Sequence, residues 1–196
     1  MGPPLAVGGD LEGAEALVLG STSPQRRDIL EQLGIPFIVV APEYDEVGDD
    51  PVEHAAGKAR SVDGGGWLVL GVDTDVFLDG GRLGKAATAE EAREMLARLA
   101  GRTHEVVSGL CLRGSVPEQL HRVVTAVTFR PVAAEEIARY VESGEWQGRA
   151  GAYAIQGLGA TLVERIEGDY LNVVGLPAAL LVRLLAELLP DRFGID

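Results

Sequence analysis

The chain of 196 residues is poor in cysteine, in positive charge and in long hydrophobic runs, and each shortage excludes a class of protein. The single cysteine, Cys111, lies in the apolar run VVSGLCL. One cysteine forms no intrachain disulfide and no zinc site built from several thiolates. Cys111 is therefore expected to be a small buried residue on a strand.

Positive charge is scarce. Lysine and arginine total 17 against 30 aspartates and glutamates, which gives a formal net charge of -13. Binding to nucleic acid or to an anionic membrane needs a basic face, so neither is expected as a partner. A small anionic ligand remains compatible with the composition if the few cations gather in one place.

Long hydrophobic runs are missing as well. The N-terminal stretch MGPPLAVGGDLEG has neither the basic region nor the apolar region of a signal peptide. The most apolar segment, 176–189, is shorter than the roughly 20 residues of a membrane span, and Arg183 and Glu187 interrupt it. We expect a cytoplasmic protein whose last helix faces the core.

Short β-branched runs alternate with helical patterns along the chain, which predicts an α/β fold. The expected strands are 16–20, 37–40, 67–74, 104–114, 120–131 and 161–168. Five helices are expected. Two begin after the N-cap residues Ser23 and Thr88, and the other three span 52–61, 133–143 and 177–189. Ile29, Leu30 and Leu33 are expected to form the apolar face of the first helix.

No internal repeat or low-complexity linker divides the chain. We therefore expect one domain over residues 15–190, with two lobes around a cleft. Residues 1–14 and 191–196 are expected to be short tails.

The stretch GSTSPQRR (20–27) combines hydroxyl and guanidinium side chains at a strand-to-helix turn. Free backbone N–H groups and the positive end of the helix dipole make such a turn an anion site. Ser21, Ser23 and Arg26 or Arg27 would complete a phosphate cradle. An ordinary capped helix with solvated arginines is the alternative.

In VLGVDTDV (69–76), Asp73 and Asp75 are expected at the end of a buried strand. Carboxylates at that place hold hard cations beside phosphates or activate a water molecule. The alternative is that these acidic residues begin a turn.

Several familiar motifs are absent. RLGKA (82–86) lacks the earlier glycine and the Ser or Thr of a phosphate-binding P-loop, and GLGA (157–160) is not a dinucleotide fingerprint. The three histidines, His54, His104 and His121, have no metal-binding spacing and are expected to be structural or exposed. Lys58 and Lys85 are either point charges for a phosphate or solvated surface charges.

Eight motifs taken together are more specific than any one of them. They are GSTSPQRR (20–27), PEYDE (42–46), GKA (57–59), GVDT (71–74), LGK (83–85), GRTHEVVSG (101–109), GAYAIQG (151–157) and GDYLNVVGLP (168–177). In this order and spacing the chain resembles the Maf family of nucleoside triphosphate pyrophosphatases, from about Leu17 to about Leu189.

The resemblance implies a Maf/ITPase-like α/β fold, with a two-lobed mixed sheet and flanking helices around a central cleft, usually as a homodimer. It also implies metal-dependent hydrolysis of a nucleoside triphosphate between the α- and β-phosphates, which yields the monophosphate and pyrophosphate. The implied cofactor is a divalent cation of the Mg²⁺ or Mn²⁺ type.

Roles follow from the matching positions. Asp73 matches the acidic position that is taken as the base activating water. Ser21, Arg26, Lys58 and Lys85 match the positions that line the phosphate pocket. Fixed cations in a water-poor site stabilise the charge that develops on phosphoryl oxygens, so these residue types suit the reaction.

Metal and base positions also match. Glu46 and Asp73 correspond to the positions that hold the metal, and Thr74 and Gln156 to positions that select the base. Thr74 with GAYAIQG indicates the branch acting on dTTP and UTP. Gln25 departs from that branch, which has arginine directly after the proline, so a charged contact is lost.

Three alternatives stay open at this point. The chain could be a nucleotide-binding regulator with weak catalysis, or a pyrophosphatase with a 7-methyl-GTP type of preference. A phosphatase acting on monophosphates would be recognised by its orthophosphate product.

Overall fold

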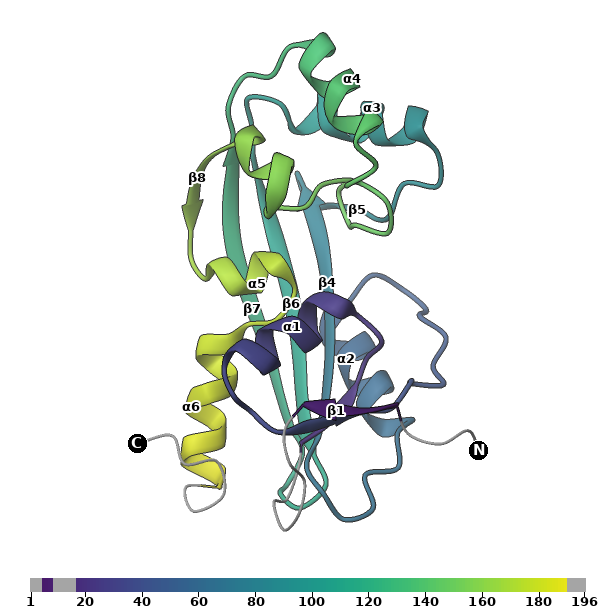
Figure 1. Cartoon of the computed structure of the whole chain (residues 1–196), viewed down its shortest axis with the longest axis vertical. Helices are drawn as coiled ribbons and strands as arrows, with labels where there is room; N and C mark the ends of the chain where they lie inside the picture. Colours follow the sequence, from purple (N-terminus) through teal and green to yellow (C-terminus); the bar gives the residue numbers. More distant parts are fainter. Residues whose placement is uncertain (1–4, 9–16, 190–196) are drawn as a thin grey trace. The chain divides into compact units, whose positions relative to one another are not determined.

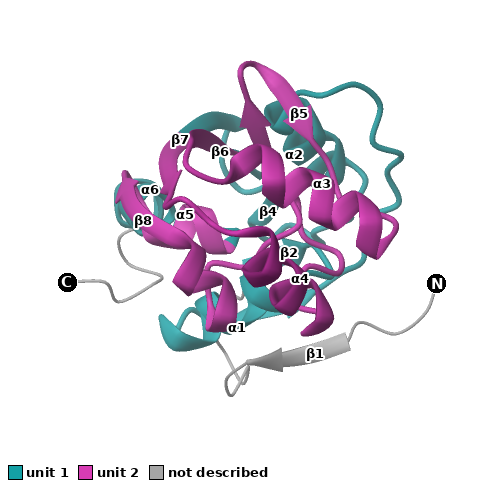
Figure 2. Cartoon of the chain, turned by 90° about the horizontal axis from the view of Figure 1, so that it is seen from above, with its two compact units in different colours: residues 1–73, 108–123, 175–196 teal, residues 74–107, 124–174 magenta. Residues whose placement is uncertain are grey.

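The computed structural model describes residues 5–8 and 17–189, and the predicted tail 191–196 lies outside them. Two compact units make up the chain (Figure 2). Unit 1 comprises residues 1–73, 108–123 and 175–196. Unit 2 comprises residues 74–107 and 124–174.

The backbone forms one eight-stranded sheet in the order β1-β3-β2-β4-β6-β7-β8, with β5 paired to β4 (Figure 1). The strands are β1 (Leu5–Gly8), β2 (Leu17–Gly20), β3 (Phe37–Val39), β4 (Val69–Leu78), β5 (Gly81–Leu83), β6 (Thr103–Arg113), β7 (Gln119–Phe129) and β8 (Val163–Glu167). Strand β2 runs parallel to β3 and β4, whereas β1 is antiparallel to β3 and β8 to β7. The predicted mixed α/β sheet is confirmed.

Six α-helices and one 3₁₀-helix lie in the described part of the chain. They are α1 (Pro24–Gln32), α2 (Pro51–Arg60), α3 (Ala89–Leu99), α4 (Ala134–Glu142), η1 (Gly157–Leu162), α5 (Tyr170–Val174) and α6 (Ala178–Leu188). The five predicted α-helices are confirmed, while α5 and η1 were not predicted. No described helix has the length and apolar character that crossing a membrane requires.

In unit 1, helix α2 lies directly on the sheet. A Cβ atom at Gly71 of β4 would overlap the carbonyl oxygen of Ala55, and one at Gly109 of β6 would overlap that of Pro51. Only glycine permits so close an approach. Because α2 is held this near, its polar side chains are brought against strand β4. The predicted burial of Cys111 in β6 is confirmed, and burial raises the pKa of its thiol to about 11.

In unit 2, helices α3 and α4 pack beside one another over a core that includes Leu96, Leu99 and Ile137. The hydroxyl of Thr88 accepts the backbone N–H of Glu91, which confirms the predicted cap of α3. The Glu91 carboxylate accepts the backbone N–H of Ala87, the residue before the N-cap Thr88, and not the N–H of Thr88 itself.

The predicted end of strand β4 is wrong. The strand continues to Leu78, so Asp73 and Asp75 lie within it and not at its carboxyl end. Both aspartates are buried, and each has a cationic partner, Lys58 for Asp73 and Arg82 for Asp75. A buried carboxylate with a cation beside it is compatible with a strand interior.

The start of α1 differs in one detail from the prediction. Ser23 is the N-cap residue and Pro24 begins the helix, but the Ser23 side chain makes no capping bond. Its hydroxyl donates instead to the side-chain oxygen of Gln25, at 3.1 Å. Leu33, expected on the apolar face, is 41% exposed because it follows the end of the helix.

Candidate active site

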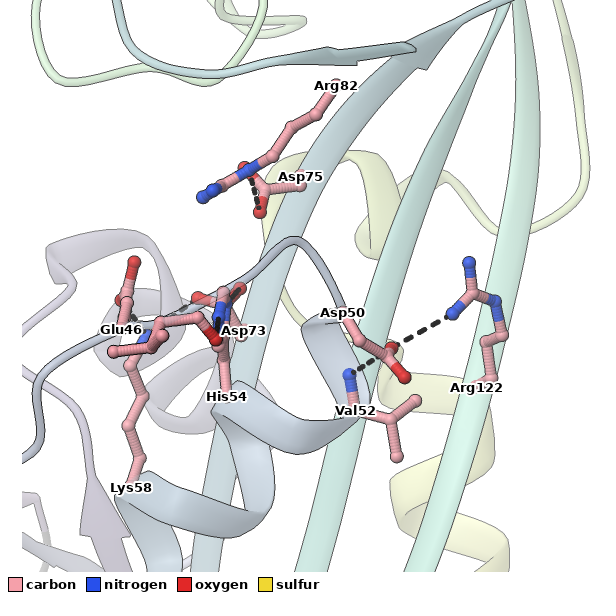
Figure 3. Close-up of polar contacts among 10 residues, drawn as sticks. Glu46, Asp50, Val52, His54, Lys58, Asp73, Asp75, Arg82 and Arg122 are labelled. Atoms are coloured by element: carbon pink, nitrogen blue, oxygen red, sulfur yellow. Dashed lines mark hydrogen bonds and ion pairs between the residues drawn. The ribbon is translucent and has the colours of Figure 1, made fainter. Parts of the chain in front are cut away.

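Three side chains of unit 1 gather around Asp73, and with it they form what we call the Asp73 centre: Glu46, His54, Lys58 and Asp73 (Figure 3). The Lys58 ammonium donates to Asp73 Oδ1 at 2.6 Å and lies 2.6 Å from Glu46 Oε1. His54 Nδ1 lies 3.2 Å from Asp73 Oδ2. Both oxygens of the Asp73 carboxylate are therefore engaged.

Helix α2 supplies two members of this centre. His54 and Lys58 are four residues apart, and that spacing places both on the same face of the helix. The helix begins at Pro51, and its N-cap Asp50 accepts the backbone N–H of Val52 at 3.0 Å.

The segment that bears Glu46 is positioned by Tyr44. The Tyr44 ring lies where a Cβ atom of Gly57 would be, so the glycine in α2 admits this aromatic side chain. Gly57, which weakens a helix on propensity alone, therefore serves a packing role. The packing brings the chain at 44–46 against the helix that carries Lys58.

Opposing effects set the pKa of Asp73. Burial would raise it, but the charge and hydrogen bond of Lys58, the charge of Arg26 and the hydrogen bond with His54 outweigh burial and lower it below the ordinary value. The group is thus a carboxylate at neutral pH. A carboxylate with a lowered pKa is a weak proton acceptor, and it is suited to orienting a water molecule and holding a cation.

The predicted phosphate cradle at the start of α1 is partly assembled. Arg26 is 8% exposed, and it donates from Nη1 to the Ser21 hydroxyl at 2.8 Å and from Nε to the Gly175 carbonyl at 2.9 Å. Arg27 is exposed. Of the two arginines that the sequence left open, Arg26 is therefore the one fixed beside Ser21.

The remaining predicted residues lie elsewhere. Gln25 is half-buried in α1, beside Ser23. Thr74 follows Asp73 in β4 and begins unit 2. In unit 2, Lys85 is exposed and pairs through its backbone with Ala150, and Gln156 is exposed as the N-cap of η1. The roles of these four residues stay predictions.

The Asp73 centre fits a divalent ion. Glu46, His54 and Asp73 each offer one ligand atom, and these atoms all lie within 4.8 Å of one another. Carboxylate oxygens suit Mg²⁺ and Mn²⁺, and an imidazole nitrogen suits first-row transition metals.

His54 was not predicted as a site residue, because the spacing of the three histidines in the sequence matches no metal-binding motif. One sequence signal pointed to it: His54 precedes Lys58, a predicted site residue, by one helical turn. The four-residue spacing places His54 and Lys58 on one face of the helix, but it does not reveal that this face lies against Asp73.

Comparisons with known proteins identify the family of the chain. A family model described as "Maf-like protein" matches residues 16–188. A dTTP/UTP pyrophosphatase of Symbiobacterium thermophilum is 46% identical over 182 residues, which cover 88% of this chain and 94% of the relative. A dTTP/UTP pyrophosphatase of Nitratidesulfovibrio vulgaris is 47% identical over 190 residues, which cover 90% of each chain.

Among solved structures, a HAM1 protein from Coxiella burnetii shares the fold. Its TM-score is 0.54 at 17% identity, over 88% of this chain and 98% of that one. At this identity the likeness concerns the fold alone.

Proposed function

The chain belongs to the Maf family, and from this premise we propose that it is a pyrophosphatase that hydrolyses dTTP and UTP to the monophosphate and pyrophosphate. The observation that carries the proposal is the buried, ionised Asp73 with Lys58 beside it. The relatives named dTTP/UTP pyrophosphatase, which align over most of this chain, support the same reaction.

Binding of the triphosphate falls to the start of α1. The Arg26 guanidinium, the Ser21 hydroxyl and the first N–H groups of the helix offer donors to phosphate oxygens. Lys85 matches a further phosphate position of the family. These cations let a protein of net charge -13 accept a tetra-anionic substrate.

In the hydrolytic step, the oxygen of a water molecule bonds to the α-phosphorus and the bond from that phosphorus to the bridging oxygen breaks. Asp73 accepts a hydrogen bond from this water and orients it, and Lys58 and Arg26 stabilise the charge on the phosphoryl oxygens. Pyrophosphate leaves with the electrons of the broken bond, and the proton of the attacking water passes to bulk water. A divalent ion bound by Asp73 and Glu46 would supply Lewis acidity at the same place.

Base preference rests on three positions. Thr74 and Gln156 match the dTTP/UTP branch, whereas Gln25 stands where that branch has arginine. Gln25 keeps an amide for hydrogen bonding but carries no charge. We propose that the protein prefers dTTP and UTP, and that Gln25 contacts the substrate more weakly than the arginine that the dTTP/UTP branch has at this position.

Family membership also supports three further proposals: a divalent cation as cofactor, a homodimer and a cytoplasmic location. Light scattering coupled to size-exclusion chromatography tests the dimer. A mass of about 41 kDa, twice the 20.7 kDa of the chain, is expected, and a mass of one chain would refute it.

The deciding experiment incubates the purified protein and Mg²⁺ or Mn²⁺ with dTTP, UTP, CTP and 7-methyl-GTP and identifies the products. Equal amounts of monophosphate and pyrophosphate from dTTP and UTP are expected. Release of orthophosphate would refute the reaction, and faster turnover of 7-methyl-GTP would refute the base preference. Tight binding without turnover would favour a regulator.

A further inference from the structure

His54 has two hydrogen-bond acceptors facing its two ring nitrogens. Nδ1 lies 3.2 Å from Asp73 Oδ2, and Nε2 lies 3.3 Å from the carbonyl oxygen of Val47. The ring is completely buried, so no solvent shares these contacts. A neutral imidazole has one N–H group, and an ionised carboxylate and a carbonyl oxygen can only accept. The neutral ring therefore serves only one acceptor: with Nδ1–H on Asp73, Nε2 faces the Val47 carbonyl with a lone pair, and with Nε2–H on Val47, Nδ1 faces the Asp73 carboxylate with one.

A cation between Nδ1 and Asp73 Oδ2 removes this conflict, because Nε2–H can then donate to Val47 while Nδ1 and Oδ2 both bind the cation. Lys58 contacts Oδ1 of Asp73 and Oε1 of Glu46, so its ammonium is on the other oxygen of Asp73. Two ligand atoms bound at right angles to one ion, each at about 2.1 Å, lie about 3.0 Å apart. The 3.2 Å between Nδ1 and Oδ2 is close to that separation.

We propose that His54 Nδ1 is a ligand of the divalent ion, together with Asp73 and Glu46, and that this mixed nitrogen and oxygen site selects Mn²⁺ over Mg²⁺. The proposal deepens the metal site of the proposed function. Mg²⁺ prefers oxygen ligands and retains its water, whereas imidazole is a ligand of first-row transition metals; Mn²⁺ is the weakest binder of that series, and the selectivity proposed is over Mg²⁺ alone.

The surroundings of His54 meet two further requirements of a metal ligand. The Val47 carbonyl oxygen lies 3.3 Å from Nε2, where it can accept from Nε2–H when Nδ1 binds the ion, as outer-shell acceptors do for metal-bound imidazoles. The Glu46 side chain is 37% exposed, so the ion keeps a side open to water and to phosphate oxygens. A catalytic ion needs such open positions.

The test is electron spin echo envelope modulation on Mn²⁺ bound to the substrate-free protein. Modulation from a directly coordinated ¹⁴N nucleus is expected in the native chain. It should vanish in His54→Asn, which keeps a short polar side chain beside Asp73 but removes the imidazole. His121→Gln, which removes an imidazole from strand β7 of the same unit, should leave the modulation unchanged.

Affinity provides the second readout. Titration of Mn²⁺ and Mg²⁺ into the same proteins should show Mn²⁺ binding weakened about tenfold or more in His54→Asn, with Mg²⁺ binding changed by less than about threefold. A parallel loss for both ions would refute the selectivity.

Native protein that binds Mn²⁺ without nitrogen modulation would overturn the proposal and make His54 a hydrogen-bond partner of Asp73. That measurement needs no variant, so it decides even if His54→Asn fails to fold. Nor does it need turnover. Modulation in a protein that hydrolyses no nucleotide would uphold the ligand and refute the proposed function, whereas turnover without modulation would refute the ligand alone.

Discussion

Among the described residues, each unit buries one histidine and one aspartate, but the two units use them differently. In unit 1, His54 is 0% and Asp73 7% exposed, and in unit 2, His104 is 2% and Asp75 4% exposed. The unit 1 pair is in mutual contact, and it shares Lys58 with the carboxylate of Glu46 (Figure 3).

The unit 2 residues have separate partners. Asp75 is 2.8 Å from the guanidinium of Arg82, and His104 Nε2 is 2.8 Å from the Tyr153 hydroxyl, with the ring of Phe129 packed edge-on against the imidazole. Burial of a titratable group is common to both units, so it does not identify a site. A candidate site is indicated instead by several such groups gathered around one carboxylate, and the Asp73 centre shows this arrangement.

The largest effect should come from Asp73→Asn. Loss of the carboxylate that orients water is expected to lower kcat/KM for UTP by about 10²- to 10⁴-fold. The amide has nearly the same shape, so the melting temperature should change by only a few degrees. Steady-state kinetics with pyrophosphate detection measures the effect, and residual activity within tenfold of the native protein would remove Asp73 from the reaction.

The next effect concerns His104 and pH. Burial lowers the pKa of this imidazole from 6.5 to about 4. The folded state favours the neutral ring, so its stabilising contribution is complete above pH 6.5 and is lost as pH falls from 6.5 toward 4. The loss is about 3 kcal/mol in total.

Urea unfolding of the native protein and of His104→Gln at pH 7 and pH 4.5 measures this contribution. The native protein should lose more stability than the variant between these two pH values. Equal losses would mean that His104 is not held neutral by burial.

The Asp75–Arg82 pair should behave as a structural ion pair. Asp75→Leu leaves the guanidinium without its carboxylate and is expected to cost about 1–3 kcal/mol. The melting temperature would fall by about 5 °C. Adding Arg82→Leu should restore most of the loss, because the unpaired charge is then gone. Additive losses in a double-mutant cycle would contradict this interpretation.

The smallest effect is expected at Gln25, next to Arg26 at the start of α1 in unit 1. Gln25→Arg restores the charge that the dTTP/UTP branch has there, and should raise kcat/KM for dTTP and UTP by about two- to fivefold. Gln32→Arg adds the same charge at the other end of α1 and serves as the control. An equal gain in both variants would show general electrostatic attraction in place of a specific contact.

Local patterns predicted much of the fold. The Ser23–Pro24 pair and the Thr88 cap predicted the correct starts of α1 and α3, because helix starts depend on a few neighbouring residues, although Ser23 itself makes no side-chain capping bond. Strand β4 was predicted to end four residues too early, at position 74 instead of Leu78. Its aspartates are polar in the sequence, and the cations beside them come from α2 and β5, which no local pattern reveals.

The site was predictable in part for the same reason. The family motifs pointed to Asp73, Lys58 and Glu46, and the structure brings these three together. His54 lay outside every motif, since its significance depends on the close approach of α2 to β4. That approach requires the glycine at position 71, a tertiary requirement that becomes visible only in the packed structure.

The most direct test of the central claim is a Mn²⁺ titration of the native protein, Asp73→Asn and Asp75→Asn, monitored by the electron paramagnetic resonance signal of free Mn²⁺. One bound ion per native chain is expected, with affinity weakened by about tenfold or more in Asp73→Asn and near-native affinity in Asp75→Asn. Equal Mn²⁺ affinity in the two variants, each shown to be folded by its melting temperature, would contradict the central claim.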